Sequence, residues 1–236
     1  MKKHIILIII TALSLLTGCF DKVLTKDCTD FSLSGEGGAG RNGDPYSYDP
    51  LLDASLQPDL TKSYQNRKFD GEEFIRGHMV PSNDRSGRDN YDLFFSTNIM
   101  PQSSALNSGV WNSLEQKVHS VWSRRQKCDT LYVVTGTYEG SGGRYVTDNS
   151  GYKRKSLVPE GIYKVVLARL SDGSYKALGV YFDNKTGAAG TFTRDLAISV
   201  DTLEEKVGED IFVNLPDAVE SKVEAADPRE DSFWWN

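Results

Sequence analysis

The stretch from Phe74 to Glu115, FIRGHMVPSNDRSGRDNYDLFFSTNIMPQSSALNSGVWNSLE, holds the side chains from which a chemical site can be predicted. Between Asn107 and Arg125, apolar residues recur at three- and four-residue steps, which predicts an amphipathic helix. Around Arg76–His78 the chain carries Gly, Pro, Ser and Asn, which are typical of loops. A loop with one imidazole that faces a helix with an amide and a carboxylate indicates a metal-assisted hydrolytic site.

Runs of β-branched and aromatic residues follow this stretch. Residues 129–136 (DTLYVVTG) predict a buried strand, and residues 162–182 predict two strands joined by the turn SDGS. Residues 198–207 predict the end of a strand followed by a helix that is capped by Asp201 or Thr202. The expected fold class is therefore α+β, with a mixed or antiparallel sheet and inserted helices.

Residues 1–18 have the pattern of a lipoprotein signal peptide. Lys2 and Lys3 precede an apolar run that is too short for a bilayer-spanning helix, which needs about 20 residues. The LTGC at residues 16–19 resembles a lipobox, in which Cys19 receives the lipid. An ordinary secretory peptide with an incidental Cys19 is the alternative. We expect an exported protein held on the bacterial cell envelope, at the outer membrane, by its N-terminal lipid alone.

Composition divides the remaining chain into a tether and one domain. Residues 19–48 predict a lipidated N-terminus with a flexible tether, because residues 29–48 are rich in Gly, Ser and Asp. Residues 49–236 are long enough for one domain with a core. The 39% hydrophobic and 25% charged residues of the whole chain are ordinary globular values. The net charge of -6 argues against non-specific nucleic-acid binding through overall charge, although a local basic patch could still bind a polyanion.

Two cysteines follow Cys19 in a compartment that permits disulfides. Cys28 and Cys128 can form one bridge or remain separate thiols, and the sequence leaves both states open. Neither lies at zinc-ligand spacing from a histidine or a second cysteine.

A general base has two histidine candidates, because His4 lies in the signal peptide. His78 follows Arg76 by two residues. A guanidinium beside an imidazole lowers the pKa of the imidazole and favours the neutral form that a general base requires. His119 lies on the predicted helix and is interpreted as a surface or supporting residue.

The predicted helix places polar residues on one face. Asn107, Trp111, Glu115 and His119 follow one another at four-residue steps. An amide oxygen and a carboxylate suit a hard cation such as Mg²⁺. Asn107 and His119 would be about 18 Å apart along the helix, so one ion cannot bind both.

Three segments together resemble a known family. IRGHMVPSNDR, STNIMPQSSALNSGVWNSLE and DTLYVVTG are similar to the DNA/RNA non-specific endonucleases, which are ββα-metal nucleases with the signature Asp-Arg-Gly-His. The similarity runs from about residue 49 to the C-terminus. It implies the ββα-metal nuclease fold, DNA and RNA as substrates, and Mg²⁺ as cofactor, with Mn²⁺ as an alternative.

The resemblance also implies a role for each matching residue. His78 would be the general base that deprotonates the attacking water. Asn107 would be the direct protein ligand of Mg²⁺, and Glu115 would hold waters bound to that ion. Asn98 would orient the site near His78, and Arg76 would face the phosphate.

Two features depart from the family pattern. Ile75 stands where the signature has an aspartate, and the segment before it is short, with only Arg67 to replace an additional arginine. The first expectation is a lipid-anchored, Mg²⁺-dependent endonuclease. The departures support an alternative, a catalytically weak or inactive nuclease-like lipoprotein that binds nucleic acid or a partner. Hydrolysis of another phosphodiester on the same fold is a third reading.

Overall fold

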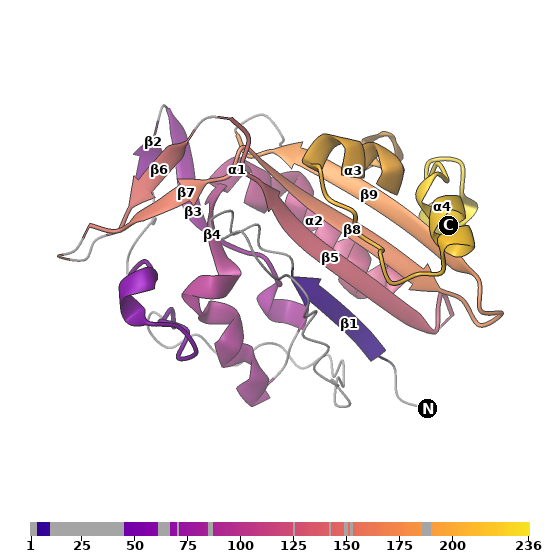
Figure 1. The fold of residues 1–236 in the computed structure, drawn as a ribbon, viewed down its shortest axis with the longest axis horizontal. Coiled ribbons are helices and arrows are strands. Elements are labelled where there is room, and N and C mark those ends of the chain that lie inside the picture. Colours follow the sequence, from indigo (N-terminus) through magenta and orange to yellow (C-terminus); the bar gives the residue numbers. More distant parts are fainter. Residues whose placement is uncertain are drawn as a thin grey trace.

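The computed structural model describes residues 4–9, 45–60, 67–69, 71–84, 87–124, 126–141, 143–148, 151, 153–185 and 190–236. Its largest sheet has the strand order β1-β5-β8-β9 (Figure 1). Strands β5 (Thr130–Tyr138), β8 (Gly161–Arg169) and β9 (Tyr175–Asp183) form antiparallel pairs. The structure confirms these three strands, which the apolar runs of the sequence predict.

The fourth strand, β1 (His4–Ile9), lies parallel to β5 at the edge of the sheet. Its register runs from His4 opposite Thr130 to Ile9 opposite Thr135. This strand belongs to the stretch interpreted as a signal peptide. Because β5, β8 and β9 pair with one another directly, a chain without β1 would retain a continuous three-stranded antiparallel sheet. Among the helices of the described ranges, none combines the length and apolarity needed to cross a membrane.

The main sheet has a separate core on each face, because side chains alternate along a strand. One face buries Leu131, Val133, Ile162, Val166, Leu178 and Val180 against the helical segment 104–122. The other buries Val134, Val165, Leu167 and Ala177 against α3 (Val200–Val207) and α4 (Asp217–Glu224). Figure 1 shows the two helical layers on opposite sides of the sheet. This arrangement confirms the α+β class.

Two smaller sheets and several short helices complete the described fold. The first sheet contains β2 (Arg67–Phe69), β3 (Glu72–His78) and β4 (Ile99–Ser103), and the second contains β6 (Arg144–Thr147) and β7 (Lys155–Val158). The short helices are η1 (Ala54–Leu56), η2 (Ser82–Asp84), η3 (Gly87–Phe94), η4 (Ser96–Asn98), η7 (Arg194–Leu196) and α5 (Ser232–Trp235). Trp234 of α5 is buried, and its carbonyl accepts the indole N–H of Trp122 at 3.1 Å.

Strand β3 corrects the expectation that Arg76–His78 lies in a loop. The backbone of these residues pairs with β4, from Phe74 opposite Ser103 to His78 opposite Ile99. Phe74 is fully buried and anchors the strand. The loop-forming Pro, Ser and Asn residues follow His78, so the imidazole sits at the end of a rigid strand.

The helix expected over residues 107–125 occupies residues 104–122 instead. It consists of α1 (Ser104–Leu106), the π-helical turn η5 (Asn107–Trp111), α2 (Asn112–Lys117) and the π-helical turn η6 (Val118–Trp122). Gly109 has φ -97° and ψ -118°, outside the helical region. The backbone between Asn107 and Trp111, the first two residues of the expected row, is therefore not regularly helical. Turns of π-helix such as this one often lie at functional sites.

The expected cap of α3 differs. Ser199 caps α3, because its hydroxyl accepts the backbone N–H of Thr202 at 3.2 Å, whereas Asp201 lies in the first turn. Just before the expected domain, Ser47 donates its N–H to the carbonyl of Phe94 at 3.2 Å. A polar, glycine-rich composition does not reveal such backbone pairing.

Candidate active site

Strands β3 and β4 and the helical segment 104–122 follow one another as a strand–strand–helix unit. His78 is the last residue of β3 and lies opposite Ile99, the first residue of β4. Strand β4 runs away from His78, and the helical segment starts directly after it. The segment then returns toward the His78 end, because Nδ1 of His119 lies 3.2 Å from the Asp84 carboxylate in the loop after β3.

Aromatic rings enclose the His78 imidazole. The Phe94 ring meets it edge-on with a centroid distance of 5.1 Å, and the Tyr46 ring lies at 5.9 Å. Tyr46 also stacks on the Arg76 guanidinium, whose Cζ is 3.8 Å from the ring centroid. Arg76 donates through Nη1 to the Leu60 carbonyl at 2.9 Å. Arg76 and His78 are thus held in the same aromatic cluster.

Asn98 holds the loop that follows His78. Its Oδ1 accepts the Val80 N–H at 2.9 Å, and its Nδ2 donates to the carbonyls of Val80 (3.1 Å) and Leu93 (2.9 Å). Its own carbonyl accepts the Met79 N–H at 2.9 Å. The buried amide therefore fixes the backbone on the C-terminal side of the imidazole, and its role in orienting the site near His78 stays a prediction.

The glycine before His78 permits close packing of β3 against a polar side chain of β4. A Cβ atom built on Gly77 would lie 2.2 Å from Oε1 of Gln102. Gln102 lies opposite Ile75 in the ladder and is fully buried. Its two amide atoms make no hydrogen bond within the described part of the chain. Ile75 stands in the place of the signature aspartate. It therefore lies opposite a buried amide, that of Gln102 on β4.

The helical segment carries the expected amide and carboxylate. Asn107 and Glu115 are both half-buried, eight residues apart on either side of Trp111. The pKa of the Glu115 carboxyl is raised to about 7. Burial is the main cause, the Lys164 ammonium opposes the rise, and the Asp84 carboxylate contributes to it. Small changes in the surrounding charge therefore decide whether Glu115 is ionised near neutral pH.

Lys164 belongs with Glu115 and Asp84 to one group of interacting charges, and the sequence did not reveal it. It lies on β8, is 1% exposed, and donates through Nζ to the Thr135 hydroxyl at 2.6 Å. Its ammonium lies 4.9 Å from the centroid of a Trp111 ring. Burial lowers the pKa of Lys164, whereas Glu115 and Asp84 raise it. A lysine at an apolar position of a strand that is otherwise buried is the signal that could have identified it.

Asp84 is the second missed member, and it joins the loop to the helix. Its contact with His119 raises the pKa of the imidazole, chiefly through the hydrogen bond. The His119 side chain is 33% exposed. His119 thus contacts the loop after β3 through Asp84, and its supporting role stays a prediction.

Asn184 fastens the strand–strand–helix unit to the main sheet. It follows β9, is fully buried, and accepts the Ser103 N–H through Oδ1 at 2.8 Å. Its Nδ2 donates to the carbonyls of Pro101 (3.0 Å) and Pro159 (3.1 Å). No sequence motif distinguishes this asparagine, because its partners come from distant parts of the chain.

Two of the three cysteines lie in the N-terminal part of the chain that the structure does not describe. Cys19 and Cys28 lie outside the described residues, so the lipid and the bridge remain predictions. Cys128 is buried, and its Sγ donates to the Trp122 carbonyl at 3.4 Å.

A histidine at a strand end, an antiparallel partner strand and a helix with an amide and a carboxylate define the ββα-metal nuclease fold. A solved structure of the EndoG/EndoGI complex contains a similar fold, with a TM-score of 0.52 and 19% identity over 77% of this chain and 76% of that chain. The family model for DNA/RNA non-specific endonucleases matches residues 25–218. This chain belongs to the DNA/RNA non-specific endonuclease family, whose members are metal-dependent nucleases.

Named relatives agree with this assignment. The nuclease of Serratia marcescens is 28% identical over 152 residues, which cover 64% of this chain and 55% of that protein. The mitochondrial nuclease EXOG of Homo sapiens is 30% identical over 173 residues, which cover 69% of this chain and 46% of that protein. The chain thus spans about half the length of the curated relatives it matches.

Proposed function

We propose that this protein is a Mg²⁺-dependent endonuclease that hydrolyses phosphodiester bonds in DNA and RNA. One observation carries the proposal. The contact between Asp84 and His119 closes the strand–strand–helix unit, so that the loop after His78 meets the helix that carries Glu115. The family match and the names of the relatives support the same activity.

His78 is the proposed general base. Its ring is fixed by the end of β3 and by the Tyr46 and Phe94 rings, so it keeps one orientation toward a substrate. In its neutral form the imidazole accepts a proton from the attacking water.

Arg76 is the proposed phosphate-facing group. Tyr46 and the Leu60 carbonyl engage its guanidinium before substrate arrives, which limits its conformational freedom. A guanidinium can hold a phosphate through two parallel hydrogen bonds. Contacts to phosphate carry no base information, so cleavage of both DNA and RNA is expected.

Asn107 and Glu115 fit a hard divalent cation. An amide oxygen and a carboxylate are the ligand types that Mg²⁺ takes, and the raised pKa of Glu115 marks a carboxylate that a positive charge would stabilise in its ionised form. When bound there, Mg²⁺ would supply electrostatic stabilisation of the charge that develops on the phosphate. Lys164 favours the ionised Glu115 that this role requires.

We also propose that the protein is a lipoprotein anchored through Cys19. The positive residues, short apolar run and LTGC at residues 16–19 support this processing. Cleavage before Cys19 would remove β1 and leave β5, β8 and β9 paired as described. Labelling with a radioactive fatty acid in a bacterial host, with Cys19→Ala as the control, tests the anchor.

The alternative function is a weak or inactive nuclease-like lipoprotein that binds nucleic acid or a partner. Ile75 favours it, because an apolar side chain replaces the signature carboxylate beside Gln102. This alternative predicts nucleic-acid binding without cleavage.

One experiment separates the two functions. The domain without its lipid is incubated with supercoiled plasmid and with RNA, in Mg²⁺ and in EDTA. Under the main proposal Mg²⁺ supports nicking of both substrates, and His78→Ala lowers the rate by about 10²-fold or more. An exposed change in the loop after His78, Asn83→Ala, is the control and keeps full activity. A folded protein that binds the plasmid but never nicks it would establish the alternative.

A further inference from the structure

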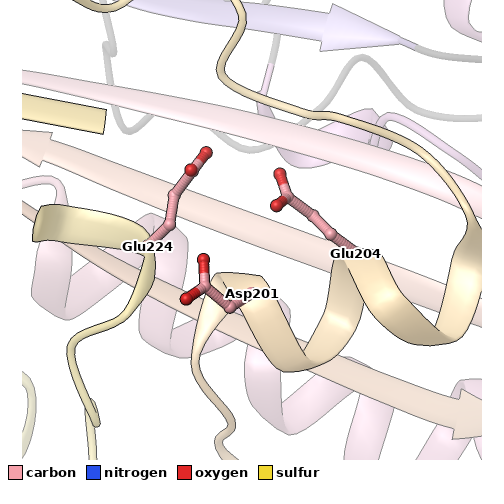
Figure 2. A group of neighbouring side chains, drawn as sticks. All are labelled: Asp201, Glu204 and Glu224. Atoms are coloured by element: carbon pink, nitrogen blue, oxygen red, sulfur yellow. The ribbon is translucent and has the colours of Figure 1, made fainter. Parts of the chain in front are cut away.

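A cluster of carboxylates lies on the face of the main sheet that α3 and α4 cover. Asp201 and Glu204 come from α3, Asp210 from the loop after it, and Glu220 and Glu224 from α4. Figure 2 shows the carboxylates of Asp201, Glu204 and Glu224 pointing toward one another from the two helices. This α3–α4 cluster lies on the opposite face of the sheet from Glu115 and Lys164.

Glu224 is the buried centre of the α3–α4 cluster. The residue is 6% exposed, and its carboxyl group shares a hydrogen bond with that of Glu204. Its Oε1 is buried without a hydrogen-bond partner among the described residues. Native proteins rarely bury a polar atom without a partner, so each such atom requires a physical explanation. Asp201 is exposed and Glu204 is half-buried, which leaves the cluster open to solvent on one side.

The oxygen geometry suits one calcium-sized ion. Ligand oxygens from Asp201, Glu204 and Glu224 all lie within 4.8 Å of one another. Two oxygens that bind one Ca²⁺ at 2.3–2.6 Å are at most about 5 Å apart, so these three oxygens can share one such ion. Ca²⁺ commonly takes several protein carboxylates at once, whereas Mg²⁺ keeps most of its waters and takes only one or two. Glu204 is already held in place, because one of its oxygens accepts the Ile211 N–H at 2.8 Å.

Charge also favours a cation at this position. Within the described ranges, no lysine or arginine forms an ion pair with a member of the α3–α4 cluster. Burial, together with repulsion from Glu204, Glu220, Asp201 and Asp210, raises the pKa of Glu224 to about 7. The cluster therefore needs either protons or a bound cation to balance its charge near neutral pH.

We propose that the α3–α4 cluster binds one Ca²⁺ through Asp201, Glu204 and Glu224. Asp210 and Glu220 supply further negative charge, because their oxygens and those of Glu224 form a second group within 4.8 Å. The ion joins α4 to α3 and so fastens the C-terminal part of the chain to the sheet. An affinity of about 10⁻⁴ to 10⁻³ M, the range of extracellular calcium modules, fits a site with one open side. This structural role is independent of the proposed nuclease activity.

Thermal unfolding of the full chain at pH 7.5 tests the proposal, with 5 mM CaCl₂ compared with EDTA. We expect Ca²⁺ to raise the Tm by about 3 °C or more, since an ion that binds only the folded state stabilises it. Glu224→Gln and Asp201→Asn should lose this shift. The second variant changes an exposed residue, so it is expected to fold. Glu205→Gln, an exposed change on the same helix, should keep the shift.

A second control separates this site from the candidate active site. Asn107→Ala should keep the Ca²⁺-dependent Tm shift, because Asn107 lies on the other face of the sheet. Equal Tm shifts in the wild type and in Glu224→Gln would overturn the proposal. The proposal would also be overturned if Ca²⁺ left the Tm of the wild type unchanged while acidification to pH 5.5 raised the Tm in a manner that depends on Glu224. The cluster would then hold protons instead of an ion.

Discussion

Nδ1 of His119 lies 3.2 Å from Oδ1 of Asp84, and this contact connects the loop after His78 to the helix that carries Glu115. The two residues are 35 positions apart in the sequence. The imidazole is a hydrogen-bonding partner whose charge depends on pH, so the strength of this connection should depend on pH as well.

The first prediction concerns that dependence. Asp84 raises the pKa of His119 above its ordinary value of 6.5. A raised pKa means that the pair stabilises the fold fully below pH 6.5 and loses this contribution as the pH rises through the folded-state value. A double-mutant cycle with Asp84→Asn and His119→Ala should give a coupling energy of about 0.5–1 kcal/mol at pH 5.5 and almost none at pH 9. Urea unfolding measures it, and a coupling energy that grows with pH would contradict the assignment.

The second prediction concerns Lys164. Its ammonium opposes the rise in the pKa of Glu115, so Lys164→Met should raise that pKa above 7 and leave less ionised carboxylate at neutral pH. We expect the rising limb of the pH–rate profile for plasmid cleavage to move upward by about one pH unit. Thr135→Val removes the hydrogen bond of Lys164 but keeps its charge, and it should move the profile much less. An unchanged profile in Lys164→Met would exclude this electrostatic role.

The third prediction concerns Asn98. Asn98→Ala removes three buried side-chain hydrogen bonds and leaves Val80 N–H and two carbonyls without these partners. The free energy of unfolding should fall by about 2–4 kcal/mol. Asn98→Asp keeps the acceptor for Val80 but loses both donated bonds, so its loss should also be large. Asn83→Ala, an exposed change in the neighbouring loop, serves as control in the same urea titration and should change stability by less than about 0.5 kcal/mol.

The fourth prediction concerns Gly77. Gly77→Ala would place a Cβ 2.2 Å from Oε1 of Gln102, and the resulting overpacking should cost about 1–3 kcal/mol of stability. Gln102→Gly in the same chain removes all three colliding atoms, Oε1, Cβ and Cδ of Gln102, so the double variant should lose less stability than the sum of the single variants. Gly151→Ala introduces a Cβ with no atom within 4 Å and controls for the glycine change itself. Strict additivity of the two changes would show that β3 and β4 adjust without strain.

Several elements could be predicted from the sequence because their signals are local. The apolar runs that form β5, β8 and β9 identify buried strands by composition alone. The helix after residue 104 is detectable from its apolar spacing to within three residues at each end. Three candidates could be selected from the sequence, namely His78, Asn107 and Glu115. Their residue types and spacing match a motif, and a motif can be recognised without any knowledge of packing.

The sequence by itself thus determined the family, the fold class and the principal candidates for base and metal ligand. Tertiary structure decided that His78 ends a strand, since backbone pairing with β4 outweighs the loop-forming residues nearby. It also decided that Lys164 lies with Glu115. The alternation of β8 and the pairing of sheet with helix bring these two residues together, and such long-range burial leaves no local pattern in the chain.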